Sequence, residues 1–215
     1  MGNLFNLEGG LMTGLSKVFD IFYLSILWLI TSIPIVTIGA STTALYYGVV
    51  KVIRHERGYL TKEYFRSFKA NFITGTILWL IILLFGSLLY LNMRLAVKMG
   101  GTQGYILICI YRAMFFILLC VSVYIFPNLS RFTMRKRQLI HTSFFMAMKH
   151  LPTTIVLVVI VVVSYYVIRI IPITVSFLPA LSCLLFSFLM ERVLKKYMPK
   201  KEDGNDESAD EWYLE

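Results

Sequence analysis

The side chains in this sequence that are best suited to bind an ion or a solute are hydroxyls inside an apolar tract. Six of them lie between Thr31 and Thr43, around one proline and one glycine. Where a membrane helix is broken in this way, freed backbone carbonyls can coordinate sodium or line a solute path. The hydroxyls can instead hydrogen-bond to those carbonyls, which is the role we favour. The candidate helix-break or pathway residues are Thr31, Pro34, Thr37, Gly39 and Thr42.

Two ionisable side chains, Asp20 and Arg112, are candidate intramembrane charges. An ionised group at membrane depth is costly unless it is paired or reaches water. Asp20 could neutralise Arg112 if the N-terminus lies outside the cell, or Arg112 could extend to lipid phosphates. Arg94 and Arg169 also lie near the predicted outer side, where the three arginines together could attract an anion.

Catalytic chemistry is poorly represented in this sequence. The histidines lie in basic loops, at His55, His141 and His150. No His or Cys has a partner at metal-ligand spacing, and a Walker A glycine loop is absent. The three cysteines lie within apolar tracts, as small buried hydrophobes do. We therefore expect no enzyme, no metal and no cofactor.

The composition predicts a membrane protein. Hydrophobic residues make up 58% and charged residues 15% of the 215, against about 45–50% and 25% in soluble domains. Residues 1–201 contain 21 basic and 5 acidic side chains, a balance of +16. The cations lie in loops beside apolar tracts, which is the positive-inside pattern and not that of a nucleic-acid binder.

The apolar tracts predict an all-α polytopic bundle of five or six transmembrane helices. The later tracts lie at about 72–92, 105–126, 153–171 and 173–190. The first, from 18 to 50, is too long for one crossing of a core about 30 Å thick. Pro34 divides it. We favour a hairpin of helices 16–33 and 41–56, which gives six helices; the alternative is one broken helix.

The loops between tracts set the orientation. Residues 51–71 contain six Lys or Arg, 127–152 contain five and 191–201 contain five, whereas 93–104 contain two. The basic loops and the C-terminus are therefore expected in the cytoplasm. The candidate surface for partners or lipid is Arg54, Arg57, Lys62, Arg66, Lys69, Arg131, Arg135, Lys136, Arg137 and Lys149.

The segments 61–72 and 139–152 resemble two amphipathic helices on the cytoplasmic face. Phe65 and Lys69 align with Phe145 and Lys149 at an offset of 80 residues. The match indicates either an internal repeat of about 41–92 and 121–171 or the shared composition of juxtamembrane helices. Residues 1–198 are predicted to form a single transmembrane domain, and 199–215 a flexible acidic tail.

Two segments carry a resemblance to a known family. The run 27–47 reads LWLITSIPIVTIGASTTALYY, and 65–72 reads FRSFKANF. Together they resemble the YesL-like (DUF624) family of bacterial membrane proteins of unknown function, over about residues 1–195. Genes of that family typically lie beside carbohydrate ABC importers, two-component sensors and polysaccharide-degrading enzymes. The resemblance implies a multi-pass protein of the bacterial plasma membrane and transfers no catalytic residue.

Three functions remain open at this point. The favoured one is a non-catalytic accessory subunit of an oligosaccharide ABC importer, in contact with its permease or ATPase and with the lipid bilayer. The second is an independent small-solute transporter or channel. The third is a membrane sensor-regulator of a sugar-utilisation operon.

Overall fold

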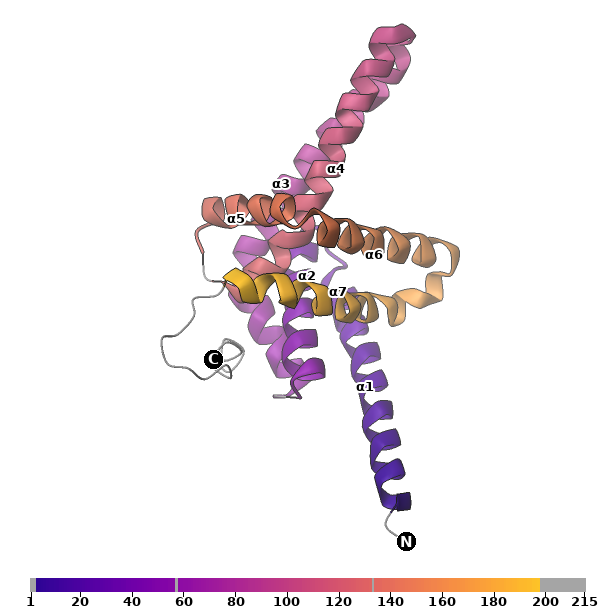
Figure 1. The fold of residues 1–215 in the computed structure, drawn as a ribbon, viewed down its shortest axis with the longest axis vertical. Coiled ribbons are helices and arrows are strands. Elements are labelled where there is room, and N and C mark those ends of the chain that lie inside the picture. The colour runs from indigo at the N-terminus through magenta and orange to yellow at the C-terminus, as the bar shows by residue number, and fades with distance from the viewer. Residues whose placement is uncertain (1–2, 57, 133, 198–215) are drawn as a thin grey trace.

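The protein is a bundle of helices (Figure 1). The computed structural model describes residues 3–56, 58–132 and 134–197, with side chains from residue 15 onward, and every regular element in these ranges is helical. Four stretches there are long and apolar enough to cross a membrane: Ile35–Arg54, Leu60–Met99, Gly101–Arg131 and Leu151–Ile170. The all-α membrane fold is confirmed. Arg57 and the predicted tail at 199–215 lie outside the described residues.

The first apolar tract forms a hairpin, as favoured. Helix α1 (Asn3–Thr31) is followed by a 3₁₀ turn (Ile35–Thr37), then by α2 (Ile38–Gly48), which continues as one π-helical segment, η2 (Val49–Arg54). Three contacts join residues before the break to residues after it: Trp28 with Thr42, Leu24 with Gly48, and Lys17 with Glu56. The separation in sequence grows from one contact to the next. That order identifies two antiparallel helices and excludes a single broken helix.

A second hairpin joins α3 (Leu60–Met99) to α4 (Gly101–Arg131). Its turn uses Gly100 and Gly101 at φ 63° and 64°, a left-handed conformation that glycine adopts without steric cost. The segment 61–72, predicted as a separate amphipathic helix, is instead the first part of α3. The reason is local, because no proline or glycine interrupts the chain between Leu60 and Gly75.

The segment predicted at 139–152 does form a helix of its own, α5 (Lys136–Lys149). Helix α6 (Leu151–Ile170) begins immediately after it. Pro152 has no N–H to continue α5, and prolines are tolerated in the first turn of a helix. The internal repeat remains a prediction. In its first half α3 is one continuous helix, whereas the corresponding part of the second half is divided into α5 and α6.

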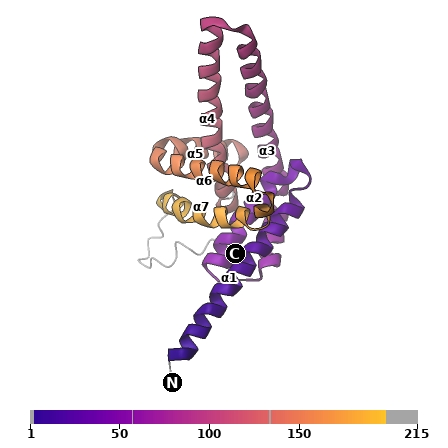
Figure 2. The ribbon, with the colours of Figure 1, turned by 90° about the vertical axis from the view of Figure 1, so that its right-hand side faces the viewer.

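A third hairpin pairs α6 with α7 (Leu178–Leu194), which ends in the 3₁₀ turn η4 (Lys195–Tyr197). Between them lies a 3₁₀ segment, Pro172–Ser176, so α7 begins five residues later than its predicted tract. The N–H of Ala180 in its first turn donates to Ser25 Oγ of α1 at 3.1 Å. Figures 1 and 2 show this hairpin lying across α3 and α4 instead of beside them, which the sequence did not predict.

Helix α2 and its π-helical extension form the centre of the molecule. In the apolar 18-residue stretch of each membrane-spanning segment, the share buried inside the protein is 72% for Ile35–Arg54, 11% for α3 and 6% for α4. Large apolar side chains of α3 and α4, including Leu84, Leu91 and Ile106, are exposed. A soluble protein rarely leaves so much contiguous apolar surface in water, and lipid tails are the solvent that matches it.

The close packing of α2 on α3 depends on glycine. A Cβ built on Gly39 would lie 2.3 Å from the carbonyl oxygen of Gly75 and 2.7 Å from Trp79 Cβ. Gly39 is one of the candidate helix-break residues predicted from the sequence. It lies instead in the first turn of α2, where the missing side chain lets two backbones touch, as small residues do in membrane helix packing.

Candidate functional site: the basic end of the bundle

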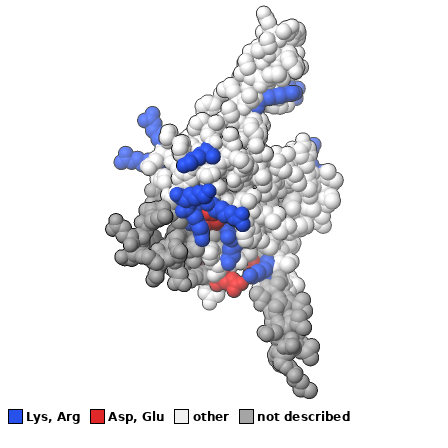
Figure 3. Space-filling model, in the orientation of Figure 1, with Lys and Arg blue, Asp and Glu red and all other residues white. Residues whose placement is uncertain are grey.

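The three basic segments meet at the C-terminal half of α7. The guanidinium of Arg54 donates to the carbonyl of Ser187 at 3.1 Å and lies 4.5 Å above the ring of Phe188. Arg131, at the end of α4, pairs with Glu191. Figure 3 shows Lys and Arg side chains gathered around this region. We call η2, the first turns of α3, the end of α4, α5 and the end of α7 the basic end.

The end of α5 joins the same region. His150 lies 3.2 Å from the hydroxyl of Tyr197, and the ammonium of Lys149 lies 5.4 Å from the centre of that ring. The sequence predicted that these loops share one side of the membrane, and the structure places them in contact.

A buried triad joins three helices at the basic end. The hydroxyl of Tyr46 donates to Glu191 Oε1 at 2.7 Å, and Arg131 pairs with Glu191 Oε2. The Arg131 side chain is fully buried and that of Glu191 is 5% exposed. Taking charges out of water is costly unless they are paired and hydrogen-bonded. The triad therefore fixes how α2, α4 and α7 meet.

A second buried pair holds the start of α3. The ammonium of Lys51 lies 2.9 Å from Glu63 Oε2 and 3.1 Å from the hydroxyl of Tyr47. Lys51 and Arg131 are 80 residues apart, the offset of the predicted repeat. Lys51 lies in η2 and Arg131 ends α4, and each is paired with a buried carboxylate.

Sequence reasoning missed both pairs. Residues 1–201 contain only five acidic side chains, and Glu63 and Glu191 are two of them. Acids that persist in segments with a strong basic excess are a usable signal of specific pairing. Because Glu63 and Glu191 both lie near helix ends, they could not be told from ordinary charged loop residues in the sequence.

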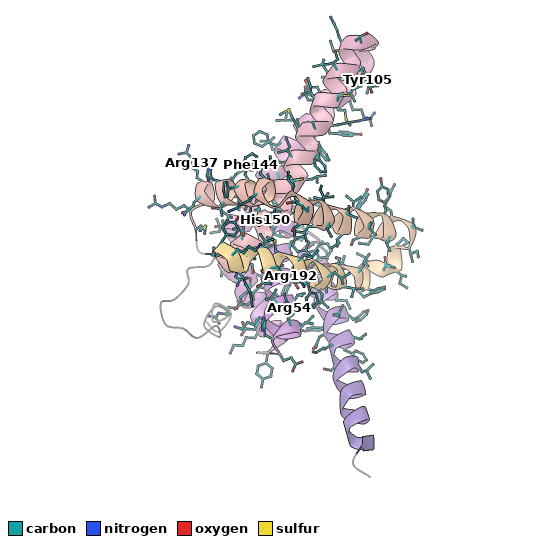
Figure 4. The ribbon with its side chains drawn as sticks, viewed as in Figure 1. Arg54, Tyr105, Arg137, Phe144, His150 and Arg192 are labelled. Atoms are coloured by element: carbon teal, nitrogen blue, oxygen red, sulfur yellow. The ribbon has the colours of Figure 1, made fainter. Side chains whose placement is uncertain are left out.

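Helix α5 is anchored on one face and exposed on the other. Leu139 and Met146 are fully buried, and Asn128 Nδ2 of α4 donates to Ser143 Oγ at 2.9 Å. The opposite face exposes Phe144, Phe145 and Met148 by 46%, 52% and 50%. The cations Arg135, Lys136 and Arg137 are exposed at its start. Figure 4 places Arg137 and Phe144 on the side of α5 away from α7.

The first turns of α3 form a shallow groove. It has a volume of about 540 Å³ and is lined by Tyr59, Thr61, Lys62, Phe65, Arg66 and Lys69. Three of these residues, Lys62, Arg66 and Lys69, are predicted surface cations. Arg54, from the same basic segment, contacts α7 instead.

Four of the six hydroxyls at the helix break, those of Thr31, Thr37, Ser41 and Thr43, donate to backbone carbonyls. Thr31 Oγ1 lies 2.8 Å from the carbonyl of Leu27, and Thr37 Oγ1 donates to the carbonyls of Thr31 and Pro34 at 2.6 and 2.7 Å. Thr42 Oγ1 accepts from the Trp28 indole at 3.3 Å. These bonds agree with the favoured structural role, in which side chains satisfy carbonyls freed by a proline.

The candidate intramembrane charges are not brought together. Asp20 lies in α1 and Arg112 in the exposed half of α4, and among the described residues no salt bridge joins them. Arg94 bonds to the hydroxyl of Tyr90 on its own helix at 2.8 Å. Arg169 is exposed at the end of α6. The outer arginines therefore do not converge on one site.

His150 is expected to give the stability of the basic end a pH dependence. Burial, followed by the charges of Lys196 and Lys149, lowers the pKa of His150 below its ordinary 6.5. The unfolded chain then binds a proton more readily than the folded chain, so folding stability falls as pH decreases through about 6.5. We expect thermal unfolding in detergent to show this loss between about pH 7 and pH 5.

The matched control for this prediction is His141, which is exposed on α5. His150→Gln should flatten the pH dependence of the unfolding temperature, whereas His141→Gln should leave it as in the native protein. Equal slopes in the native protein and His150→Gln would show that another group is responsible.

The fold and the basic end define a polytopic helical membrane protein. Within that class, residues 21–93 match the family model described as "Protein of unknown function, DUF624", which confirms the DUF624 resemblance over this part of the chain. The matched segment runs from α1 to α3 and includes the hairpin, the Gly39–Gly75 contact and the Lys51–Glu63 pair. Comparison with curated proteins and with solved structures gave no match.

Proposed function

We propose that this chain is a non-catalytic accessory subunit associated with a carbohydrate ABC importer of the bacterial plasma membrane. The exposed face of α5 is its contact surface for the permease or the ATPase. The observation that carries the proposal is an anchored helix that presents Phe144, Phe145 and Met148 beside three cations.

This surface has the composition of an interface. Aromatic residues, Met and Arg are enriched in protein contacts. The buried face of α5 and the Asn128–Ser143 hydrogen bond hold the helix in place before binding, which reduces the entropy lost on association. No acid occurs between Arg131 and Lys149, so the surface suits a partner with acidic groups. The DUF624 match adds support through the importer genes that the family resemblance implies.

The test is affinity purification of the full chain from native membranes in mild detergent. We expect permease or ATPase components of a sugar importer to co-purify. Phe145→Ala combined with Met148→Ala should lower their recovery about 10-fold, which corresponds to about 1.4 kcal/mol of binding free energy.

The control removes exposed apolar groups elsewhere, with Leu84→Ala on α3 and Phe116→Ala on α4. This variant should retain the partner. The proposal fails if no importer component accompanies the native chain, or if both double variants lose it equally.

Two other outcomes would replace the proposal. Solute uptake by proteoliposomes that contain this chain alone would indicate an independent transporter or channel. Changed expression of the sugar-utilisation operon on deletion, with normal sugar uptake, would indicate a sensor-regulator.

A further inference from the structure

The groove at the start of α3 is lined by three cations. Lys62, Arg66 and Lys69 are exposed and follow one another at spacings of four and three residues, which places them on one face of the helix. Glu63 is the one acid in 58–71, and it is buried against Lys51. Among the described residues, no carboxylate forms a salt bridge with Lys62 or Lys69.

The groove is also partly apolar. Tyr59 is 82% exposed at one of its walls, and Phe65 is exposed beside the cations. A matching ligand would therefore carry several negative charges together with aromatic or aliphatic groups.

The chain itself contains such a segment. Residues 202–215 carry seven acidic side chains and no Lys or Arg. Near the end, Trp212, Tyr213 and Leu214 stand between Glu211 and Glu215. The charge and the apolar content of this segment both complement those of the groove.

The length of the segment permits the contact. Fully extended, the 18 residues after Tyr197 span up to about 60 Å. Ser187 touches Arg54, and the ten residues from Ser187 to Tyr197 cover about 15 Å as helix. The five residues from Arg54 to Tyr59 cover at most about 17 Å. The groove is therefore within reach of residues near the C-terminus.

We infer that the acidic segment 202–215 binds the groove formed by Tyr59, Lys62, Phe65, Arg66 and Lys69 of the same chain. Tethering gives it a high effective concentration.

The test uses the full chain in nanodiscs of neutral phosphatidylcholine, treated with a zero-length carbodiimide cross-linker and analysed by mass spectrometry. We expect Lys62 and Lys69 to be joined to acids between Asp206 and Glu215. Lys136 on α5, which is also exposed, should show at least fivefold fewer such links. Raising the salt concentration from 0.05 to about 0.5 M should reduce the links strongly, because screening shortens the range of exposed charges.

A second measurement does not depend on the geometry of cross-linking. Replacing Asp206, Glu207, Asp210 and Glu211 by their amides should raise the acetylation rate of Lys62 severalfold and leave that of Lys136 unchanged. Links spread evenly over Lys62, Lys69 and Lys136, or an unchanged acetylation rate, would overturn the inference. Links found only between isotopically distinct copies would overturn the assignment to the same chain.

Discussion

Glu191→Ala is expected to lower the free energy of unfolding by about 3–5 kcal/mol, the usual loss when one partner of a buried ion pair is removed. The substitution leaves the buried guanidinium of Arg131 without this carboxylate and the hydroxyl of Tyr46 without its acceptor. Because the triad joins α2, α4 and α7, the whole basic end should loosen. Thermal and chemical unfolding of the purified protein in detergent would measure the effect.

Two controls separate this effect from a general loss of charge. Glu56→Ala removes an exposed pair with Lys17, and exposed pairs contribute only about 0–1 kcal/mol. Arg131→Met combined with Glu191→Leu should recover much of the stability, because an apolar replacement leaves no buried charge. A loss below about 1 kcal/mol in Glu191→Ala would contradict the assigned role of the triad.

Gly39→Ala is the substitution with the second largest expected effect. Its Cβ would lie 2.3 Å from a backbone oxygen of α3, and a backbone atom cannot turn aside as a flexible side chain can. Overpacking of this kind costs about 1–3 kcal/mol or more. The unfolding temperature should fall, together with the yield of monodisperse protein in detergent.

Gly86→Ala is the matched control within α3. The nearest atom to a Cβ at that position lies 3.8 Å away, which is an ordinary contact. Alanine also favours helix over glycine by up to about 1 kcal/mol, so this variant should be neutral or stabilising. Equal losses in the two variants would mean that the α2–α3 contact does not depend on the missing side chain.

The elements that the sequence predicted correctly follow from local signals. Hydropathy identified the apolar helices, and Pro34 identified the break that permits the first hairpin. Pro152 similarly separates α5 from α6. Each signal acts within a few residues, through a missing N–H or the length of an apolar run.

The features that the sequence did not predict depend on contacts between distant residues. The pairing of Glu191 with Arg131 joins positions 60 residues apart, and nothing local marks it except the scarcity of acids. The crossing of the α6–α7 hairpin over α3 and α4 is likewise decided by packing. The start of α3 was wrongly predicted for a different reason. The amphipathic composition of 61–72 suggested a separate helix, although no helix-breaking residue divides it from the rest of α3.

The buried pairs give the basic end a defined shape, and we propose that this shape makes the exposed face of α5 a surface for a partner. The Asn128–Ser143 bond and the fully buried Leu139 and Met146 fix one face. The other face is exposed. On this account, the protein acts through contact at its basic end and not through chemistry within the membrane.

Photo-cross-linking from position 145 in living cells tests this claim most directly. A photoreactive amino acid in place of Phe145 should form an adduct with a permease or ATPase subunit of a sugar importer, identified by mass spectrometry. The same probe in place of Tyr105, exposed at the far end of the α3–α4 hairpin (Figure 4), should not. Adducts with lipid alone from position 145, in cells that express the protein normally, would contradict the account.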